Sequence, residues 1–260
     1  MKVRRMGYIK AVLFDLDGVL YVGDRKIDGA EECIRSIRAT GLAIAGVTNT
    51  TTQPKRIIAE KLATFGIPIY ESEIYTPTAL AVQAVATGSA KLYVRESLLE
   101  EFQGIRVCNA NPDYIVMGDV GGEGYSPDSL LEIFTHVMNG TKVLALHKNR
   151  FWQKPDGLHL DIGPFVAAIE YATGKNAVIL GKPSKDFFNG VCRSLSIEPE
   201  NALMIGDDIE SDIGGAQQAG LKTALVQTGK YRAEFVKTTG IKADLLLPSI
   251  ADLYDGLKLL

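Results

Sequence analysis

Short apolar runs alternate along the chain with stretches whose apolar residues recur every three or four positions. Residues 11–14 and 42–47 are apolar runs typical of buried strands, and helical patterns follow them at 30–40 and 54–65. This order of strand, helix, strand and helix predicts parallel βαβ units.

The same order returns near the C-terminus. Helical patterns occur at 187–195 and 211–219, among apolar runs at 178–180, 202–205, 223–226 and 244–247. Because these runs are almost continuously apolar, they predict strands of a sheet that is covered on both faces.

The middle of the chain has its own pattern of strands and helices. Strand patterns lie at 91–94, 114–117 and 142–146, one helix is expected after Ser126, and another is expected from Pro164 to Gly174. The predicted fold class is therefore α/β. A Rossmann-like parallel-sheet core would comprise residues 1–79 and 177–260, and residues 80–176 would form a smaller inserted α/β domain.

Polar side chains follow four of the strands expected in the core. They are Asp15, Asp17, Thr48, Asn49, Lys182, Asp207, Asp208 and Asp212. Ligands of open parallel sheets bind outside the carboxyl ends of the strands, so these groups are expected at one edge. Clustered carboxylates repel one another unless a cation lies among them, and oxygen ligands favour a hard ion such as Mg²⁺. Lys182 would add a positive charge for a phosphate oxygen.

Composition narrows the function classes. The chain has 260 residues, of which 46% are hydrophobic and 23% are charged, and its net charge is −3. The chain has no excess of basic residues that would suggest binding to nucleic acid or to an anionic membrane. No apolar run approaches the roughly 20 residues that span a bilayer. The three cysteines are far apart, which favours neither a disulfide framework nor a zinc site. No signal peptide is recognisable, so a cytoplasmic location is expected.

A family resemblance rests on the polar strand ends taken together. Asp15-x-Asp17-Gly18-Val19-Leu20, Thr48-Asn49, Lys182 and Gly206-Asp207-Asp208 resemble the four motifs of the haloacid-dehalogenase-like phosphatases. The inserted domain resembles the C2-type cap of subfamily IIA, the branch that includes p-nitrophenyl phosphatases. The likeness covers nearly the whole chain and is greatest from about residue 157 to 232.

This resemblance implies a Mg²⁺-dependent phosphatase and a role for each motif residue. Asp15 would attack phosphorus and form an aspartyl-phosphate, and Asp17 would act as general acid and then general base. The carboxylates of Asp15 and Asp207 and the carbonyl of Asp17 would bind the metal. The remaining groups would bind the phosphoryl oxygens (Thr48, Asn49, Lys182) or support the metal and the lysine (Asp208, Asp212).

Asp17 helps to distinguish between the alternative functions that this family resemblance allows. The nearest look-alikes in the family have Ser at this position, and dehalogenases of the superfamily also lack the second Asp. Its presence favours phosphate chemistry over carbon–halogen cleavage, and an active enzyme over a regulatory or binding protein with little turnover. Each motif alone could be an ordinary turn or helix cap.

The inserted domain offers candidate specificity residues in His147, Lys148, Arg150 and Trp152. They could contact an anionic or planar leaving group, or belong to a solvated hairpin. The expected partner is a small phosphorylated substrate, with neither nucleic acid nor membrane. A phosphomonoester, a phosphoramidate and pyrophosphate would all fit, with p-nitrophenyl phosphate as an artificial substrate. Capped relatives often form dimers through the cap, so a homodimer of this kind is one expected arrangement.

Overall fold

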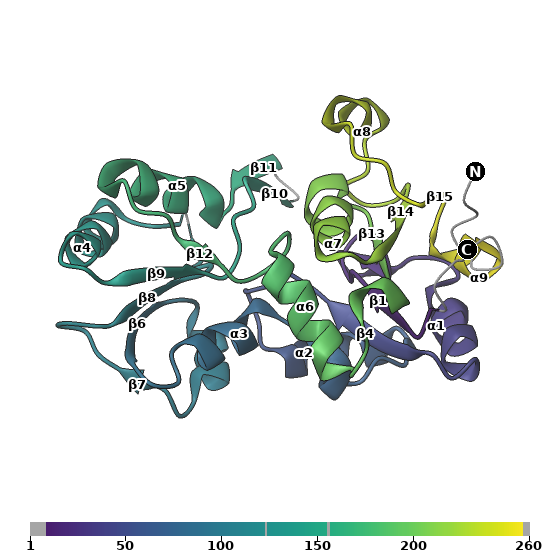
Figure 1. Cartoon of the computed structure of the whole chain (residues 1–260), viewed down its shortest axis with the longest axis horizontal. Coiled ribbons are helices and arrows are strands. Elements are labelled where there is room, and N and C mark those ends of the chain that lie inside the picture. Colours follow the sequence, from purple (N-terminus) through teal and green to yellow (C-terminus); the bar gives the residue numbers. More distant parts are fainter. Residues whose placement is uncertain (1–8, 123, 155–156, 257–260) are drawn as a thin grey trace. The chain divides into compact units, whose positions relative to one another are not determined.

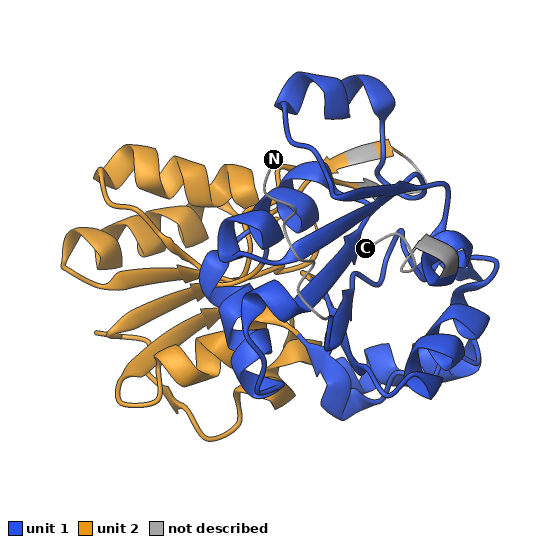
Figure 2. Ribbon diagram, turned by 45° about the vertical axis from the view of Figure 1, so that its right-hand side comes forward, with its two compact units in different colours: residues 1–48, 55–75, 182–260 blue, residues 49–54, 76–181 orange. Residues whose placement is uncertain are grey.

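The computed structural model describes residues 9–122, 124–154 and 157–256 (Figure 1). These residues fall into two compact units, coloured separately in Figure 2. Unit 1 takes the described residues within 1–48, 55–75 and 182–260, and unit 2 takes those within 49–54 and 76–181. The sequence places the boundaries between the core and the inserted domain near residues 79 and 177, and these boundaries stay a prediction.

Unit 1 is built on a parallel sheet that has six strands within the described residues, in the order β15-β14-β13-β1-β4-β5. The strands are β1 (Ala11–Phe14), β4 (Ala43–Val47), β5 (Ile74–Tyr75), β13 (Ala202–Gly206), β14 (Lys222–Val226) and β15 (Leu245–Leu247). β1 pairs with β4 on one side and β13 on the other, so the strand order reverses at β1. The carboxyl end of β1 is thus the point at which such sheets bind ligands.

Apolar side chains on both sides of this sheet explain why its strands are continuous apolar runs. All four residues of β1 are buried, and Val12 and Phe14 pack with Ile34 and Ile37 of α1 in one cluster. The helices of unit 1 are α1 (Ala30–Ala39), α2 (Lys55–Thr64), α6 (Lys185–Ser194), α7 (Gly215–Ala219), α8 (Ala233–Thr239) and α9 (Leu253–Gly256). A short hairpin of β2 (Tyr21–Val22) and β3 (Arg25–Lys26) follows β1.

Unit 2 holds a second parallel sheet, with five strands in the part of the chain described and the order β12-β9-β8-β6-β7. Its strands are β6 (Ser89–Tyr93), β7 (Arg106–Val107), β8 (Tyr114–Met117), β9 (Lys142–Ala145) and β12 (Val178–Ile179). A separate antiparallel hairpin joins β10 (Phe151–Lys154) to β11 (Gly157–Leu160). The α/β fold class, with a parallel core sheet and an inserted smaller α/β domain, is confirmed.

Alternation along β8 shows how unit 2 is layered. Ile115 and Met117 pack with buried residues of α4 (Pro127–Met138) and α5 (Ile162–Thr173). Val116 points to the opposite face and packs with residues of α3 (Pro77–Ala84) and of the short helical segment Glu96–Phe102.

Helix ends in unit 2 follow their local sequence signals. Ser126 caps α4 by accepting a hydrogen bond from the Ser129 amide at 3.1 Å, as predicted. α5 ends at Gly174 in the left-handed conformation, as predicted, but it begins before Pro164 because Asp161 accepts from the Ile162 amide at 2.7 Å. Proline is tolerated within a first helical turn, where amides lack intrahelical partners.

Two expected elements of the core differ in the structure. The run at 178–180 forms β12, which pairs with β9 in unit 2 and does not enter the core sheet. An apolar run favours a strand, but it does not choose between two sheets. The helix expected at 211–219 starts as a wide π-helical segment, Ile209–Gly214, and becomes α7 at Gly215.

No helix within the described residues is long and apolar enough to cross a membrane.

Candidate active site

Asp15 follows β1 directly and meets a lysine brought from far along the chain. Its amide donates to the Ile205 carbonyl at 2.9 Å, which fixes the backbone against β13. Its Oδ1 accepts a hydrogen bond from Lys182 Nζ at 2.7 Å, and both side chains are buried. The end of β1 and the segment before α6 thus place a buried carboxylate and a buried ammonium group in contact at the switch point.

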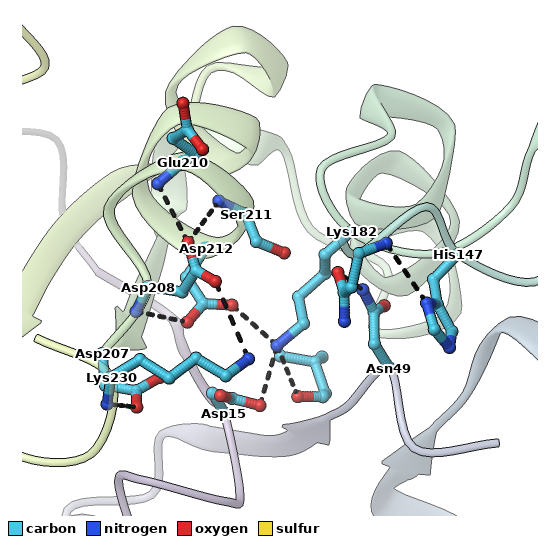
Figure 3. A network of polar contacts seen from close by, with 12 residues as sticks. Asp15, Asn49, His147, Lys182, Asp207, Asp208, Glu210, Ser211, Asp212 and Lys230 are labelled. Atoms are coloured by element: carbon cyan, nitrogen blue, oxygen red, sulfur yellow. Dashed lines mark hydrogen bonds and ion pairs between the residues drawn. The ribbon is translucent and has the colours of Figure 1, made fainter. Parts of the chain in front are cut away.

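Lys182 is held on three sides, as Figure 3 shows. Besides Asp15, its Nζ lies 2.7 Å from Asp212 Oδ1 and donates to the Val47 carbonyl at 3.2 Å. Burial works to lower the pKa of Lys182, but Asp15 and Asp212 outweigh it and the net shift is upward. The lysine is therefore charged, and its ammonium group makes two hydrogen bonds and an ion pair with these three acceptors.

Asp212 is fully buried beside this lysine, and both its oxygens have partners. Oδ1 pairs with Lys182, and Oδ2 accepts from the Asp208 amide at 3.2 Å. Burial raises the pKa of Asp212 to about 7, with Lys182 acting in the opposite direction. This carboxylate is placed to orient the lysine.

Asp207 has two oxygens in different surroundings. Oδ2 accepts a hydrogen bond from the Lys230 amide at 2.6 Å. Oδ1 is buried and has no hydrogen-bond partner among the described residues. Burial raises the pKa of Asp207 well above its usual range, and the charges of Asp15 and Asp212 add to the shift. A buried carboxylate oxygen without a partner is costly unless a cation binds it.

Two glycines make room for this carboxylate. A Cβ on Gly18 would lie 1.9 Å from Asp207 Oδ2, and a Cβ on Gly229 would lie 2.0 Å from the same atom. Both glycines have positive φ, at +95° and +57° respectively, which L side chains rarely adopt. Thr228 Oγ1 donates to the Gly18 carbonyl at 2.5 Å and joins the two loops.

The residues present fit a divalent cation. Oxygen atoms of Asp15, Asp207 and Asp212 all lie within 4.8 Å of one another and are buried. Both oxygens of Asp212 are engaged, whereas Asp207 Oδ1 is not, so Asp15 and Asp207 are the better-placed ligands. An all-oxygen donor set of this kind favours a hard ion such as Mg²⁺.

Asp17 lies on the exposed side of this cluster, at the start of the turn into the β2–β3 hairpin. The protein around it removes part of its hydration and raises its pKa, and the charge of Asp15 adds to this effect. Lys230 and Lys61 act in the opposite direction. A carboxyl with a raised pKa, still open to solvent, is suited to donating a proton.

Asp208 acts locally as a helix cap. Its Oδ1 accepts hydrogen bonds from the Glu210 and Ser211 amides at 3.1 and 3.0 Å. Its other oxygen lies 3.7 Å from Lys230 Nζ. The side chain thus shapes the turn between β13 and the π-helical segment.

Thr48 and Asn49, the expected phosphate-binding pair, lie on either side of the division between the units. Thr48 is buried in unit 1, where its amide donates to the Tyr75 carbonyl at 3.2 Å. Asn49 belongs to unit 2, where its Nδ2 donates to Asn149 Oδ1 at 3.5 Å. Their joint role stays a prediction.

The four candidate residues of the inserted domain have different surroundings within unit 2. The ring of His147 is buried, with Nε2 3.3 Å from Thr51 Oγ1 and 3.7 Å from Asp161 Oδ1. Lys148 pairs with Glu170. The Arg150 carbonyl accepts from the Asp161 amide at 3.2 Å.

Trp152, the fourth candidate, lies in β10 opposite His159. A specificity role for the four residues stays a prediction.

Lys230 is the site residue that sequence reasoning did not select. It lies just beyond the carboxyl end of β14, where polar residues again follow a core strand. The signal that found Asp15 and Asp207 therefore also existed here, at a fifth strand end.

Models of known protein families match an N-terminal and a C-terminal part of the chain. A model described as haloacid dehalogenase-like hydrolase matches residues 12–105, and a second, described as HAD-hydrolase-like, matches residues 179–253. Human haloacid dehalogenase-like hydrolase domain-containing protein 2 is 40% identical over 227 residues, which cover 86% of each chain. Phospholysine phosphohistidine inorganic pyrophosphate phosphatase of Xenopus laevis is 35% identical over 256 residues, covering 95% of this chain and 94% of that protein.

Solved structures share the fold across almost the whole chain. The p-nitrophenyl phosphatase from Archaeoglobus fulgidus matches with a TM-score of 0.89 at 24% identity, covering 96% of this chain and 100% of that one. NagD from Escherichia coli K-12 matches with a TM-score of 0.85 at 25% identity, covering 95% and 98% of the two chains.

Proposed function

This chain belongs to the haloacid dehalogenase-like hydrolases, and on that premise we propose that it is a Mg²⁺-dependent phosphatase in which Asp15 carries the phosphoryl group. The observation that carries this proposal is the contact of Asp15 with Lys182, next to the unpartnered Oδ1 of Asp207. A nucleophile, a charge-balancing ammonium group and a cation-binding oxygen meet there in one buried cluster. The substrate proposed is a small phosphomonoester, phosphoramidate or pyrophosphate.

The first chemical step is displacement at phosphorus. A carboxylate oxygen of Asp15 attacks the phosphorus, the bond from phosphorus to the leaving oxygen breaks, and Asp17 gives its proton to that oxygen. Asp15 is then an aspartyl-phosphate and Asp17 a carboxylate. Lys182 balances the negative charge between Asp15 and the phosphoryl oxygens, because its buried ammonium group is fixed there before substrate arrives.

The second step returns both aspartates to their starting states. Asp17 takes a proton from a water molecule, whose oxygen attacks the phosphorus while the bond to Asp15 breaks. Phosphate leaves, and Asp17 is again protonated. Asp15, Asp207 and the carbonyl of Asp17 would hold Mg²⁺, which neutralises charge on the phosphoryl oxygens when bound.

The remaining residues position these groups in our proposal. Asp212 orients Lys182, and Asp208 fixes the turn that carries Asp207. Thr48 and the backbone of Asn49 bind the phosphoryl oxygens.

An assay with p-nitrophenyl phosphate tests the proposal. We expect Mg²⁺-dependent release of phosphate that EDTA abolishes and that Asp15→Asn lowers to background, because the amide is a poor nucleophile. Lys237→Met is a suitable control, since Lys237 lies on α8 and pairs with Glu234 on the surface.

Full activity in Asp15→Asn, or indifference to EDTA, would refute the mechanism. Lack of turnover on any phosphorylated compound would instead favour a binding protein on this fold.

A further inference from the structure

Residues 49–54 follow β4 along the chain, but they belong to unit 2, with which Figure 2 colours them. Two hydrogen bonds attach them there. Asn49 Nδ2 donates to Asn149 Oδ1 at 3.5 Å, and Ser97 Oγ donates to the Thr52 carbonyl at 3.0 Å. The segment that carries Asn49, a proposed ligand of the phosphoryl oxygens, is therefore positioned by the inserted domain.

A buried pair of polar side chains anchors the middle of this segment. The Thr51 hydroxyl lies 3.3 Å from His147 Nε2, and the two residues are only 2% and 3% exposed. Neither group takes part in the chemical steps proposed above. Because buried polar groups cost free energy unless they are paired, this contact favours the observed conformation of the segment.

The contacts of His147 assign its tautomer. Nδ1 accepts a hydrogen bond from the Asn149 amide at 3.4 Å, drawn as a dashed line to the ring in Figure 3. A ring nitrogen that accepts a hydrogen bond carries no proton, so the neutral imidazole carries its proton on Nε2. Nε2 is then the donor to the Thr51 hydroxyl, and Asp161 Oδ1 lies 3.7 Å from the same nitrogen.

The surroundings of the ring in unit 2 are themselves fixed. Asp161 caps α5, and its amide donates to the Arg150 carbonyl at 3.2 Å. The Gly163 amide donates to the Asn149 carbonyl at 2.9 Å, an approach that requires glycine because a Cβ would lie 2.3 Å from that oxygen. The imidazole therefore connects residues 49–54 to the start of a helix.

We propose that His147 is a positioning residue that fixes residues 49–54 through Thr51 and so holds the backbone of Asn49 in the conformation that binds the phosphoryl oxygens. This inference rests on the proposed phosphatase function. A segment that leaves this conformation part of the time binds a phosphoryl group more weakly, in proportion to the fraction of time lost. The role differs from the leaving-group contact expected from the sequence, because it acts through Thr51.

Inhibition by orthovanadate, an analogue of the transferred phosphoryl group, tests this role. His147→Leu removes both ring nitrogens, and Thr51→Val removes the hydroxyl while keeping the shape of the side chain. Each should raise the inhibition constant roughly 10-fold, through loss of one buried hydrogen bond. The double variant should be no worse than His147→Leu, because both changes break the same contact. His147→Gln, whose side-chain amide supplies a donor in place of Nε2, should recover most of the loss.

Two controls separate positioning from general damage. His136→Leu makes the same substitution on α4, elsewhere in unit 2, and should leave the inhibition constant unchanged. The Mg²⁺-dependent rise in Tm should be the same in every variant, because Asp15 and Asp207 belong to unit 1.

Wild-type inhibition in His147→Leu and Thr51→Val would overturn the role of His147, as would additive losses in the double variant or a lost Mg²⁺-dependent rise in Tm. Thr51→Val conserves shape, so it decides the matter if His147→Leu does not fold. A wild-type protein that neither cleaves p-nitrophenyl phosphate nor binds orthovanadate would instead refute the proposed function itself.

Discussion

Asp17 and Asp15 are both aspartates of one short segment, but their surroundings differ. Asp15 is buried against Lys182, whereas Asp17 is exposed and has a raised pKa caused by partial desolvation and by the neighbouring charge of Asp15. A carboxylate held against a buried ammonium group suits a nucleophile, and a carboxyl that holds its proton longer suits an acid. Different surroundings thus suit these two chemically identical side chains to different roles.

Replacing Asp17 with Asn removes the transferable proton while keeping the size of the side chain. We expect kcat on p-nitrophenyl phosphate to fall roughly 10²- to 10⁴-fold, the usual contribution of acid–base catalysis. Inhibition by orthovanadate should stay within a few-fold of wild type, because Asp15 and Lys182 are unchanged. Unaltered turnover would exclude Asp17 as the acid, and loss of the folded state would make it structural.

For single residues, the sequence predicts which side chains belong to the site better than it predicts which contacts they make. Asp15 and Asp207 follow core strands, and the parallel topology alone brings them to one edge. Nothing local indicates that Asp212 would bind Lys182 or that Lys230 would fasten Asp207 through its amide, because both contacts depend on how separate loops fold back. The burial of His147 beside Asp161 is also a tertiary outcome.

At the element scale, two loops enclose the Asp207 carboxylate, and each requires a glycine. Gly229 and Gly240 both have positive φ, at +57° and +70°. A Cβ on Gly229 would meet Asp207, whereas a Cβ on Gly240 would have nothing within 4 Å. The pair therefore separates backbone strain from steric contact with the site.

We expect Gly229→Ala to raise the Mg²⁺ concentration needed for half-maximal activity at least several-fold, because the added methyl must displace the Asp207 carboxylate. Gly240→Ala should cost only the left-handed backbone strain, about 1–2 kcal/mol of stability, and leave the Mg²⁺ requirement unchanged. Thermal unfolding and Mg²⁺ titration of both variants measure the two effects. Equal Mg²⁺ requirements in the two variants would contradict the role given to Gly229.

The positions of helices and strands were predictable where the local sequence pattern alone determines the element. The strand at 11–14 and the helix that Ser126 caps carry their own patterns. β12 was assigned to the wrong sheet because three apolar residues do not encode a pairing partner. The β2–β3 hairpin was missed since its strands are short and carry mixed polarity, whereas a hairpin was one of the two interpretations given for the segment that runs into β10.

At the scale of the whole molecule, the site concentrates negative charge that the folded chain must tolerate. Asp15, Asp207 and Asp212 are buried close together, so a bound divalent cation should stabilise the folded state. At a Mg²⁺ concentration 100 times its dissociation constant, the gain is about 2.7 kcal/mol. For a chain of this length, that corresponds to roughly 5–10 °C in Tm.

Asp207→Asn separates this effect from catalysis. The variant should lose most of the Mg²⁺-dependent rise in Tm, while its Tm without metal should equal or exceed that of the wild type, because one repelling charge is gone. Differential scanning calorimetry with and without Mg²⁺ gives both values. An unchanged Mg²⁺-dependent shift would remove Asp207 from the metal site.

In the proposed mechanism the phosphoryl group passes through Asp15, and this transfer can be observed directly. Its most direct test is to quench the protein in acid during turnover of p-nitrophenyl phosphate and Mg²⁺ and to map phosphorylated peptides by mass spectrometry. We predict one added phosphoryl group on the peptide that contains Asp15, absent in Asp15→Asn and absent without Mg²⁺. Turnover with the phosphoryl group on another residue, or with no phosphorylated protein at any quench time, would contradict it.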